Sequence, residues 1–156
     1  MPRPATPVRP TGKPLALVGG PLLFEHLALF EQIEAAGGRV VLEATAEGER
    51  GMPAPFDRRK LAEDPLGCLA DAYFGAILDA FRRPNDALYS WLGRRLPESG
   101  AAGIAFVHYV WCDLWHAEAE RLRQWTALPV LALDLAEDGL TGPVRTRLEA
   151  FVEMLP

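Results

Sequence analysis

Four short, unbroken apolar runs recur along this chain, and segments with helical periodicity separate them. Strands that are buried on both faces give such runs, whereas half-exposed strands alternate apolar and polar residues. An alternation of buried strands with helices predicts an α/β domain in which helices cover both faces of a mainly parallel sheet. The runs are residues 15–18, 39–42, 103–110 and 129–133.

The order of the strands follows from general rules of chain connection. Right-handed crossovers and the common doubly wound topology predict a flavodoxin- or Rossmann-like sheet with the order 2-1-3-4. In that order the first and third strands lie side by side, and ligands bind beyond the carboxyl ends of such strands. The turn Gly19-Gly20 would then face the turn Trp111-Cys112-Asp113 across one cleft.

Helix signals fill the intervals between the runs. Asp64-Pro65 combines an N-cap residue with proline at the first helical position. Gly48, Gly51, Pro53 and Pro55 instead predict a loop over residues 43–56. The expected apolar faces are Leu23, Leu27, Phe30 and Ile33 in the first helix and Leu66, Leu69, Tyr73 and Ile77 in the next, and later helices are expected to start near Asp86, Asp113 and Thr141.

The composition is that of one ordinary globular domain. The chain has 156 residues, of which 49% are hydrophobic, and a formal net charge of −5, which argues against a nucleic-acid partner. No apolar stretch approaches the ~20 residues of a membrane span, and the proline-rich start lacks the apolar region of a secretory signal. We expect residues 1–13 to be a disordered lead-in and residues 14–156 to form a single domain. Two cysteines in this context indicate reduced thiols in the cytoplasm.

Cys112 is the strongest candidate for chemistry. It directly follows the third run and precedes Asp113, so it stands where a buried strand passes into a helix. The first turn of a helix offers free N–H groups and a partial positive charge to an anion such as a thiolate. Cys112 is therefore either a metal ligand, a cluster ligand or a nucleophile, or else a small apolar residue that completes the strand.

The remaining candidates have simpler interpretations. Cys68 shares a helix face with Ala72 and Ala76, which favours a role in helix packing. Gly19-Gly20 belongs to no longer glycine motif, so a tight turn explains it as well as a ligand does. No Ser-His-Asp arrangement or carboxylate pair suggests acid–base catalysis. His26, on the first helix, is expected at the surface.

A zinc site made of His108, Cys112 and His116 with Asp113 is not expected. At ~3.3 Å per residue, strand geometry separates His108 from Cys112 by about 13 Å, so the three side chains should not converge. Arg145 and Arg147 open the last helix, where cations oppose the helix dipole. They are expected to pair locally with Asp134, Glu137 or Asp138, and a bound anion is the other explanation.

Five segments carry motifs that occur in order along nearly the whole chain. They are residues 31–41, 48–50, 64–70, 103–113 and 142–155, of which the last reads GPVRTRLEAFVEML. These motifs resemble those in the C-terminal domain of the subunits of 2-hydroxyacyl-CoA dehydratases and benzoyl-CoA reductases, the family of the 2-hydroxyglutaryl-CoA dehydratase D-component. The resemblance implies radical chemistry on acyl-CoA thioesters, an iron–sulfur cluster bound by cysteines, and a separate ATP-dependent activator that delivers an electron.

By position, Cys112 matches the cluster cysteine that this domain contributes in the family. A [4Fe–4S] cluster normally takes several thiolates, and in the family an N-terminal domain supplies the others. The resemblance thus implies a split subunit that shares the cluster with a partner supplying that domain. The alternative is a degenerate stand-alone domain that binds an acyl-CoA-like anion or a protein without a cluster or catalysis. In either case the substrate-binding residues are expected to be Gly19, Gly20, Arg50, Trp111 and Asp113.

Overall fold

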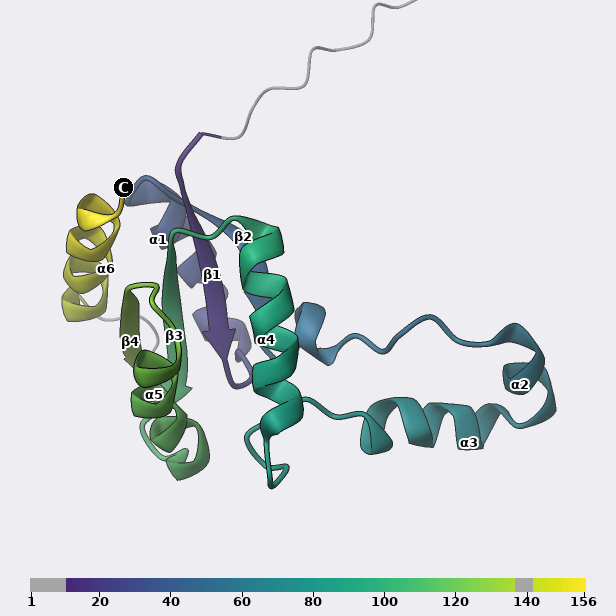
Figure 1. The fold of residues 1–156 in the computed structure, drawn as a ribbon. Helices are drawn as coiled ribbons and strands as arrows, with labels where there is room; N and C mark the ends of the chain where they lie inside the picture. Colours follow the sequence, from purple (N-terminus) through teal and green to yellow (C-terminus); the bar gives the residue numbers. More distant parts are fainter. Residues whose placement is uncertain (1–10, 137–141) are drawn as a thin grey trace, which may run out of the picture.

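The computed structural model describes residues 11–136 and 142–156 (Figure 1). Its centre is a four-stranded sheet with the order β2-β1-β3-β4, in which each neighbouring pair is parallel. This confirms the predicted fold class and the predicted strand order. The strands are β1 (Lys13–Gly19), β2 (Gly38–Ala44), β3 (Gly103–Tyr109) and β4 (Val130–Leu135).

Helices cover both faces of the sheet. On one face lie α1 (Ala28–Ala35) and α6 (Gly142–Met154), and on the other lie α4 (Asp86–Ser99) and α5 (Asp113–Trp125). The side chains of β1 alternate between the two cores, because successive residues of a strand point to opposite faces. Leu15 and Leu17 join the core beneath α1 and α6, while Ala16 and Val18 join the core beneath α4 and α5.

The first helix differs from the prediction in its phase. Residues Phe24–His26 form a 3-10 turn, and the α-helix begins only at Ala28. A 3-10 turn has three residues per turn rather than 3.6, so the helix presents Leu29 and Ile33 to the core and leaves Leu23 and Leu27 exposed. The prediction of an apolar face through Leu23 and Leu27 was therefore wrong.

His26 was predicted at the surface but is fully buried. Its Nε2 lies 2.8 Å from the carbonyl oxygen of Ala136, and its Nδ1 lies 3.1 Å from the hydroxyl of Tyr109. The ring also packs edge-on against the Tyr109 ring. The 3-10 turn directs His26 inward, and its two polar partners make this burial favourable.

An arm leaves the α/β body between β2 and α4 (Figure 1). It contains α2 (Arg58–Glu63), which was not predicted, α3 (Pro65–Ala70) and a π-helical turn (Asp71–Gly75). Asp57 caps α2. Asp64 caps α3, as predicted, and its carboxylate accepts a hydrogen bond from the Gly67 N–H in the first turn of that helix. The apolar side chains of the arm are largely exposed: Leu66 is 78% and Phe74 81% accessible.

Most of the expected lead-in, and the expected helix start at Thr141, lie outside the described residues; β1 begins at Lys13 and α6 at Gly142. Across the described residues, no helix combines the length and the apolar character needed to cross a membrane.

Candidate functional site

β1 and β3 are neighbours, as predicted, so the turn after β1 lies beside β3 near its carboxyl end. Gly19 is in register with Val107, and the N–H of Gly20 donates to the Val107 carbonyl over 3.3 Å. Gly19 has a φ of +155°, and a Cβ at this position would lie 2.0 Å from the Val107 carbonyl oxygen. This close approach requires glycine, so the tight-turn explanation of Gly19 is sufficient by itself.

The Trp115 ring from the first turns of α5 fills the space behind Gly20. A Cβ on Gly20 would lie 3.1 Å from Cδ1 of Trp115. The Arg50 guanidinium makes a cation–π contact with the same ring, 4.9 Å from its centroid. The indole N–H of Trp115 is buried and has no hydrogen-bond partner among the described residues. The turn and the start of α5 are thus held together on this face of the sheet by an aromatic ring and a cation.

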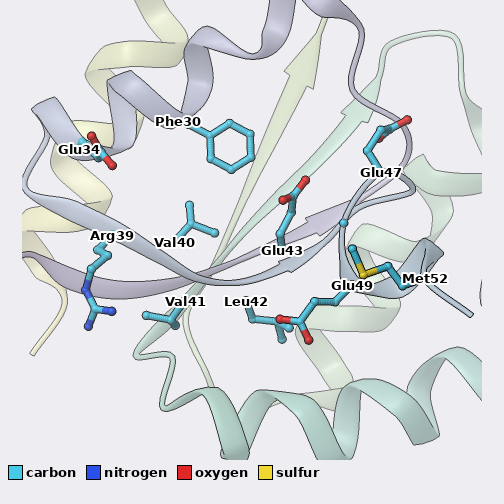
Figure 2. A pocket seen from close by; sticks show the side chains of 11 residues that line it. Phe30, Glu34, Arg39, Val40, Val41, Leu42, Glu43, Glu47, Glu49 and Met52 are labelled. Carbon is cyan, nitrogen blue, oxygen red and sulfur yellow. The ribbon is translucent and has the colours of Figure 1, made fainter. Parts of the chain in front are cut away.

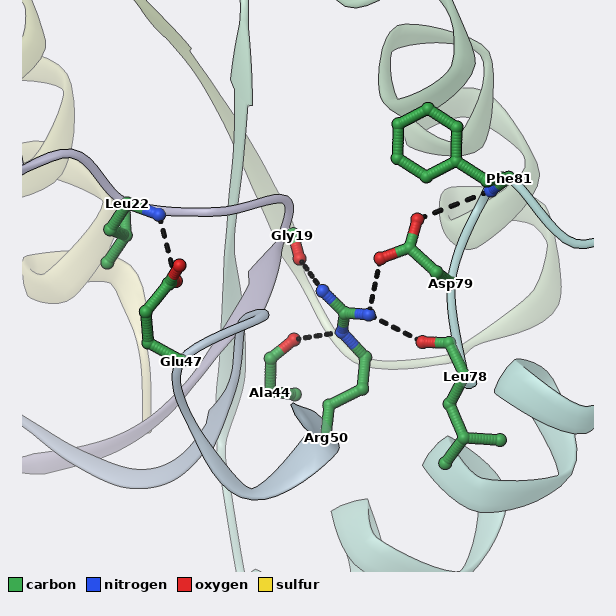
Figure 3. A network of polar contacts seen from close by, with 8 residues as sticks. All are labelled: Gly19, Leu22, Ala44, Glu47, Arg50, Leu78, Asp79 and Phe81. Carbon is green, nitrogen blue, oxygen red and sulfur yellow. Dashed lines mark hydrogen bonds and ion pairs between the residues drawn. The ribbon is translucent and has the colours of Figure 1, made fainter. Parts of the chain in front are cut away.

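Arg50 joins three segments of backbone (Figure 3). Its guanidinium donates to the carbonyls of Ala44, Leu78 and Gly19 and forms an ion pair of 2.7 Å with Asp79. Burial lowers the pKa of Arg50, and the charge of Asp79 opposes that shift. Arg50 therefore fixes the position of the Gly19 turn through its hydrogen bond to the Gly19 carbonyl.

A pocket of about 660 Å³ lies beside Arg50, between the loop after β2 and the base of the arm. It is lined in part by Met52, Tyr73 and Ile77, so it is apolar on the side of the arm, while Arg50 and Asp79 form part of its wall on the side of the body. Arg50, a residue predicted to bind substrate, therefore borders a cavity, but its side chain is only 2% exposed and its guanidinium is already bound by protein groups.

A second pocket, of about 400 Å³, runs along the free edge of β2 (Figure 2). Its walls carry the carboxylates of Glu34, Glu43, Glu47 and Glu49, and Arg39 is its one basic lining residue. Concentrated negative charge repels the phosphates of an acyl-CoA, so this pocket is the poorer candidate for such a ligand.

Cys112 is the N-cap residue of α5 and lies at the carboxyl edge of the sheet, as predicted. Its N–H donates to the Tyr109 carbonyl over 2.9 Å, and its carbonyl accepts from the His116 N–H over 2.9 Å. The thiol is half-buried and contacts the apolar cores on both faces of the sheet. Asp113 follows it as an exposed residue at the first position of the helix.

Exposed apolar side chains gather next to Cys112. Trp111 stacks on Tyr109 with ring centroids 4.7 Å apart, and the Tyr109 hydroxyl accepts from the Leu23 N–H over 2.9 Å. These contacts bring the turn after β3 and the segment before α1 together. We call the exposed large side chains of these two segments the apolar rim: Leu23, Phe24 (85% accessible), Leu27, Val110 and Trp111 (53% accessible).

The donor set at this edge fits one ligand of an iron–sulfur cluster and not a whole cluster. Cys112 is the thiol that the described residues place there, because Cys68 lies in α3 on the arm (Figure 1). A [4Fe–4S] cluster is normally held by four thiolates. The chain by itself does not supply that number, since its sequence contains two cysteines.

Cys112 does not join His108 and His116, as predicted, but the two imidazoles meet each other, which was not predicted. Their ring centroids lie 4.9 Å apart, and their ligand atoms group with that of Asp134, whereas Cys112 is not a member of the group. The prediction considered only the distance along the extended chain from His108. It did not consider that α5 packs back over the sheet, which brings His116 close to His108.

The predicted local pairing of the arginines at the start of α6 is confirmed for Arg147. Its Nη1 lies 3.9 Å from Oδ2 of Asp134, and Arg145 pairs within the helix with Glu149 at 3.8 Å. The other predicted partners, Glu137 and Asp138, lie outside the described residues.

Sequence reasoning missed Glu118, which is buried on α5. The carboxylate accepts from Arg83 over 2.8 Å and from the Tyr89 hydroxyl over 2.7 Å. Burial works to raise the pKa of Glu118, but these hydrogen bonds outweigh it and the pKa is lowered. Burial and the Glu118 carboxylate together raise the pKa of Tyr89. The available signal was the position of Glu118 one turn after Trp115, on the buried face of the helix.

Comparison with models of known protein families identifies the family of this chain. The model of the family described as "2-hydroxyglutaryl-CoA dehydratase, D-component" matches residues 2–155, nearly the whole chain. A search of curated proteins finds no match. The chain therefore belongs to the 2-hydroxyglutaryl-CoA dehydratase D-component family.

Proposed function

We propose that this chain is a subunit of an enzyme that acts on acyl-CoA thioesters, of the 2-hydroxyacyl-CoA dehydratase or benzoyl-CoA reductase type. In this proposal Cys112 contributes one thiolate to a [4Fe–4S] cluster, and a partner polypeptide contributes the others. The observation that carries the proposal is the position of Cys112 at the N-terminus of α5, on the carboxyl edge of the sheet, in a chain that the family model matches over residues 2–155.

The apolar rim supports the involvement of a partner. Exposed apolar patches on soluble domains often mark interaction sites, and this one adjoins the half-buried Cys112. A partner seated on the rim would enclose the thiol and exclude water from it. The exposed apolar side chains of the arm offer a second contact region for the same partner.

The acyl-CoA would lie beside the same edge. Trp111 offers an exposed aromatic face, and Asp113 offers an exposed carboxylate at the helix start. Gly19 and Gly20 would contribute only through the shape of their turn, because both are buried and the protein's own atoms occupy the space where their Cβ atoms would lie. Arg50 would act by holding the Gly19 turn and by forming part of the adjacent pocket. The electron would come from a separate ATP-dependent activator, as in the chemistry that the family resemblance implies.

The test is anaerobic co-expression of the full chain with the polypeptide encoded beside it. We expect the purified complex to contain iron and acid-labile sulfide and to show the visible absorption of a cluster. Cys112→Ser should lose most of the iron, whereas Cys68→Ser, the matched control on the arm, should retain it. Equal iron in the two variants would contradict the role of Cys112, and a complex without iron would refute the shared cluster.

The alternative, a stand-alone domain that binds an acyl-CoA-like anion without a cluster, rests on the single thiol at this edge. It predicts that the isolated chain binds coenzyme A thioesters in calorimetry and that Cys112→Ser binds them equally well. The iron and sulfide analysis of the co-expressed complex separates the two functions, because only the first predicts a cluster.

A further inference from the structure

A group of two imidazoles and a carboxylate lies on the face of the sheet covered by α5, separate from Cys112. His108 in β3 and Asp134 in β4 are direct partners in the register of the two strands, and both point toward α5. His116 lies on α5 above them. The three ligand atoms lie within 4.8 Å of one another at a pocket of about 390 Å³.

The hydrogen bonds of His108 leave room for a cation. Its Nδ1 lies 3.3 Å from the Tyr109 carbonyl, and its Nε2 lies 3.1 Å from Oδ1 of Asp134, so an acceptor faces each nitrogen. A neutral imidazole carries one N–H and can donate to only one of them. Donation from Nδ1 to the backbone carbonyl leaves the Nε2 lone pair free, which is the arrangement that outer-shell carbonyls impose on metal-binding histidines.

The distances suit a small divalent ion. Two ligand atoms bound about 2.0–2.1 Å from a tetrahedral zinc ion lie roughly 3.3 Å apart, close to the 3.1 Å between Nε2 of His108 and Oδ1 of Asp134. His116 is exposed, so its ring can turn to complete the set. Arg147 lies 3.9 Å from Oδ2, the other carboxylate oxygen, and thereby leaves Oδ1 directed at His108.

We propose that His108, His116 and Asp134 form a binding site for a divalent transition-metal ion of the zinc type, with water completing the coordination from the pocket. Two imidazoles and a carboxylate make up a ligand set that zinc accepts readily, with one position open. The ion would link β3, β4 and α5. The site is independent of the iron–sulfur proposal, because it uses neither cysteine.

The experiment is calorimetric titration of the full chain with Zn²⁺, in the wild type and in a Cys68→Ser/Cys112→Ser background. We expect one ion per chain in both, and Co²⁺ should give the visible bands of a low-coordinate site. His116→Ala and Asp134→Asn should each weaken zinc binding by at least ~10-fold, the lower end of the loss found when even outer-shell partners are removed.

Glu149→Gln is the matched control, because its carboxylate is exposed to nearly the same extent as that of Asp134 (51% against 52%) and pairs with an arginine in the same way. It should bind zinc as the wild type does. Absence of binding, binding that disappears with the cysteines, or unchanged binding in both His116→Ala and Asp134→Asn would overturn the site. His116 and Asp134 are exposed, so circular dichroism should show that both variants fold.

Discussion

Arg50 and Glu118 are the charged residues whose burial most affects this structure. Each is almost inaccessible, and each has several partners: backbone carbonyls and Asp79 for Arg50, and Arg83 and Tyr89 for Glu118. A buried charge of this kind is tolerated because its partners replace water, and it becomes costly when one partner is removed. Arg50 holds the Gly19 turn near the candidate site, whereas Glu118 joins α5 to Arg83 and to Tyr89 of α4.

Replacement of Arg50 by methionine should lower the free energy of unfolding by about 3–5 kcal/mol, because it leaves Asp79 buried without its partner. Arg50→Lys should also destabilise the protein, since an ammonium does not reproduce the fork that joins Gly19, Ala44 and Asp79. Urea denaturation measures both. Arg145→Gln, which breaks an exposed pair, should cost about 0–1 kcal/mol. Wild-type stability in Arg50→Lys would contradict the structural role.

Glu118 should make stability depend on pH in the acid range. Its folded-state pKa lies below that of the unfolded chain, so ionised Glu118 stabilises the fold above the unfolded pKa of about 4.3. That contribution is lost as pH falls through the folded pKa. Glu118→Gln should therefore lose less stability than the wild type between neutral pH and about pH 3, as measured by urea denaturation. Parallel losses in the two proteins would argue against this linkage.

The sequence of the arm predicts a buried helix face, but the structure exposes that face to solvent. Its helices have good caps at Asp57 and Asp64, and residues 66, 69, 73 and 77 have the spacing of a buried helix face. In the structure that face is exposed, because the arm extends away from the sheet (Figure 1). An apolar helix face that is this exposed is typical of an interaction surface.

Substitution of Leu66 and Phe74 together by aspartate should leave the stability of the isolated chain within about 0.5 kcal/mol of the wild type, since both side chains are exposed. The same variant should lose co-purification with the partner polypeptide of the proposed enzyme. Met154→Asp, at an exposed apolar position on α6 (65% accessible), is the control and should keep the partner. A large loss of stability would show that these side chains support the fold of the chain itself. An unchanged yield of complex would show that the arm does not bind the partner.

At the scale of the molecule, one sheet separates two apolar cores, and Cys112, at the carboxyl edge of the sheet, contacts both of them. β1 and β3 are central and contribute buried residues to each core, whereas β2 and β4 are edge strands. Local stability in such a structure follows burial and hydrogen bonding. The sheet should thus remain rigid while the arm opens.

Native-state hydrogen exchange tests this division. Amides of β1 and β3 should exchange most slowly, at the free energy of global unfolding, and amides of the arm should exchange through local opening. Binding of the partner should slow exchange in the arm and leave β1 and β3 unchanged. Exchange of the arm that is as slow as that of β1 would contradict the separation.

Local sequence patterns were enough to predict the central sheet. Unbroken apolar runs identified each strand, the general rule of right-handed crossovers predicted the order β2-β1-β3-β4, and the position of Cys112 between strand and helix placed it at the carboxyl edge. The strands and the place of Cys112 are determined within a few residues, because strand and helix periods depend on neighbours in sequence. The strand order came instead from the topology that such folds commonly adopt.

Only the tertiary structure decided which side chains meet. His108, His116 and Asp134 converge because β3 and β4 are in register and α5 crosses back over them, and the 3-10 turn before α1 buries His26 and exposes Leu23. Likewise, the apolar face of the arm reads as core in the sequence and lies exposed in the fold. Such outcomes depend on the path of the whole chain, since register and helix phase bring together residues that are distant in sequence.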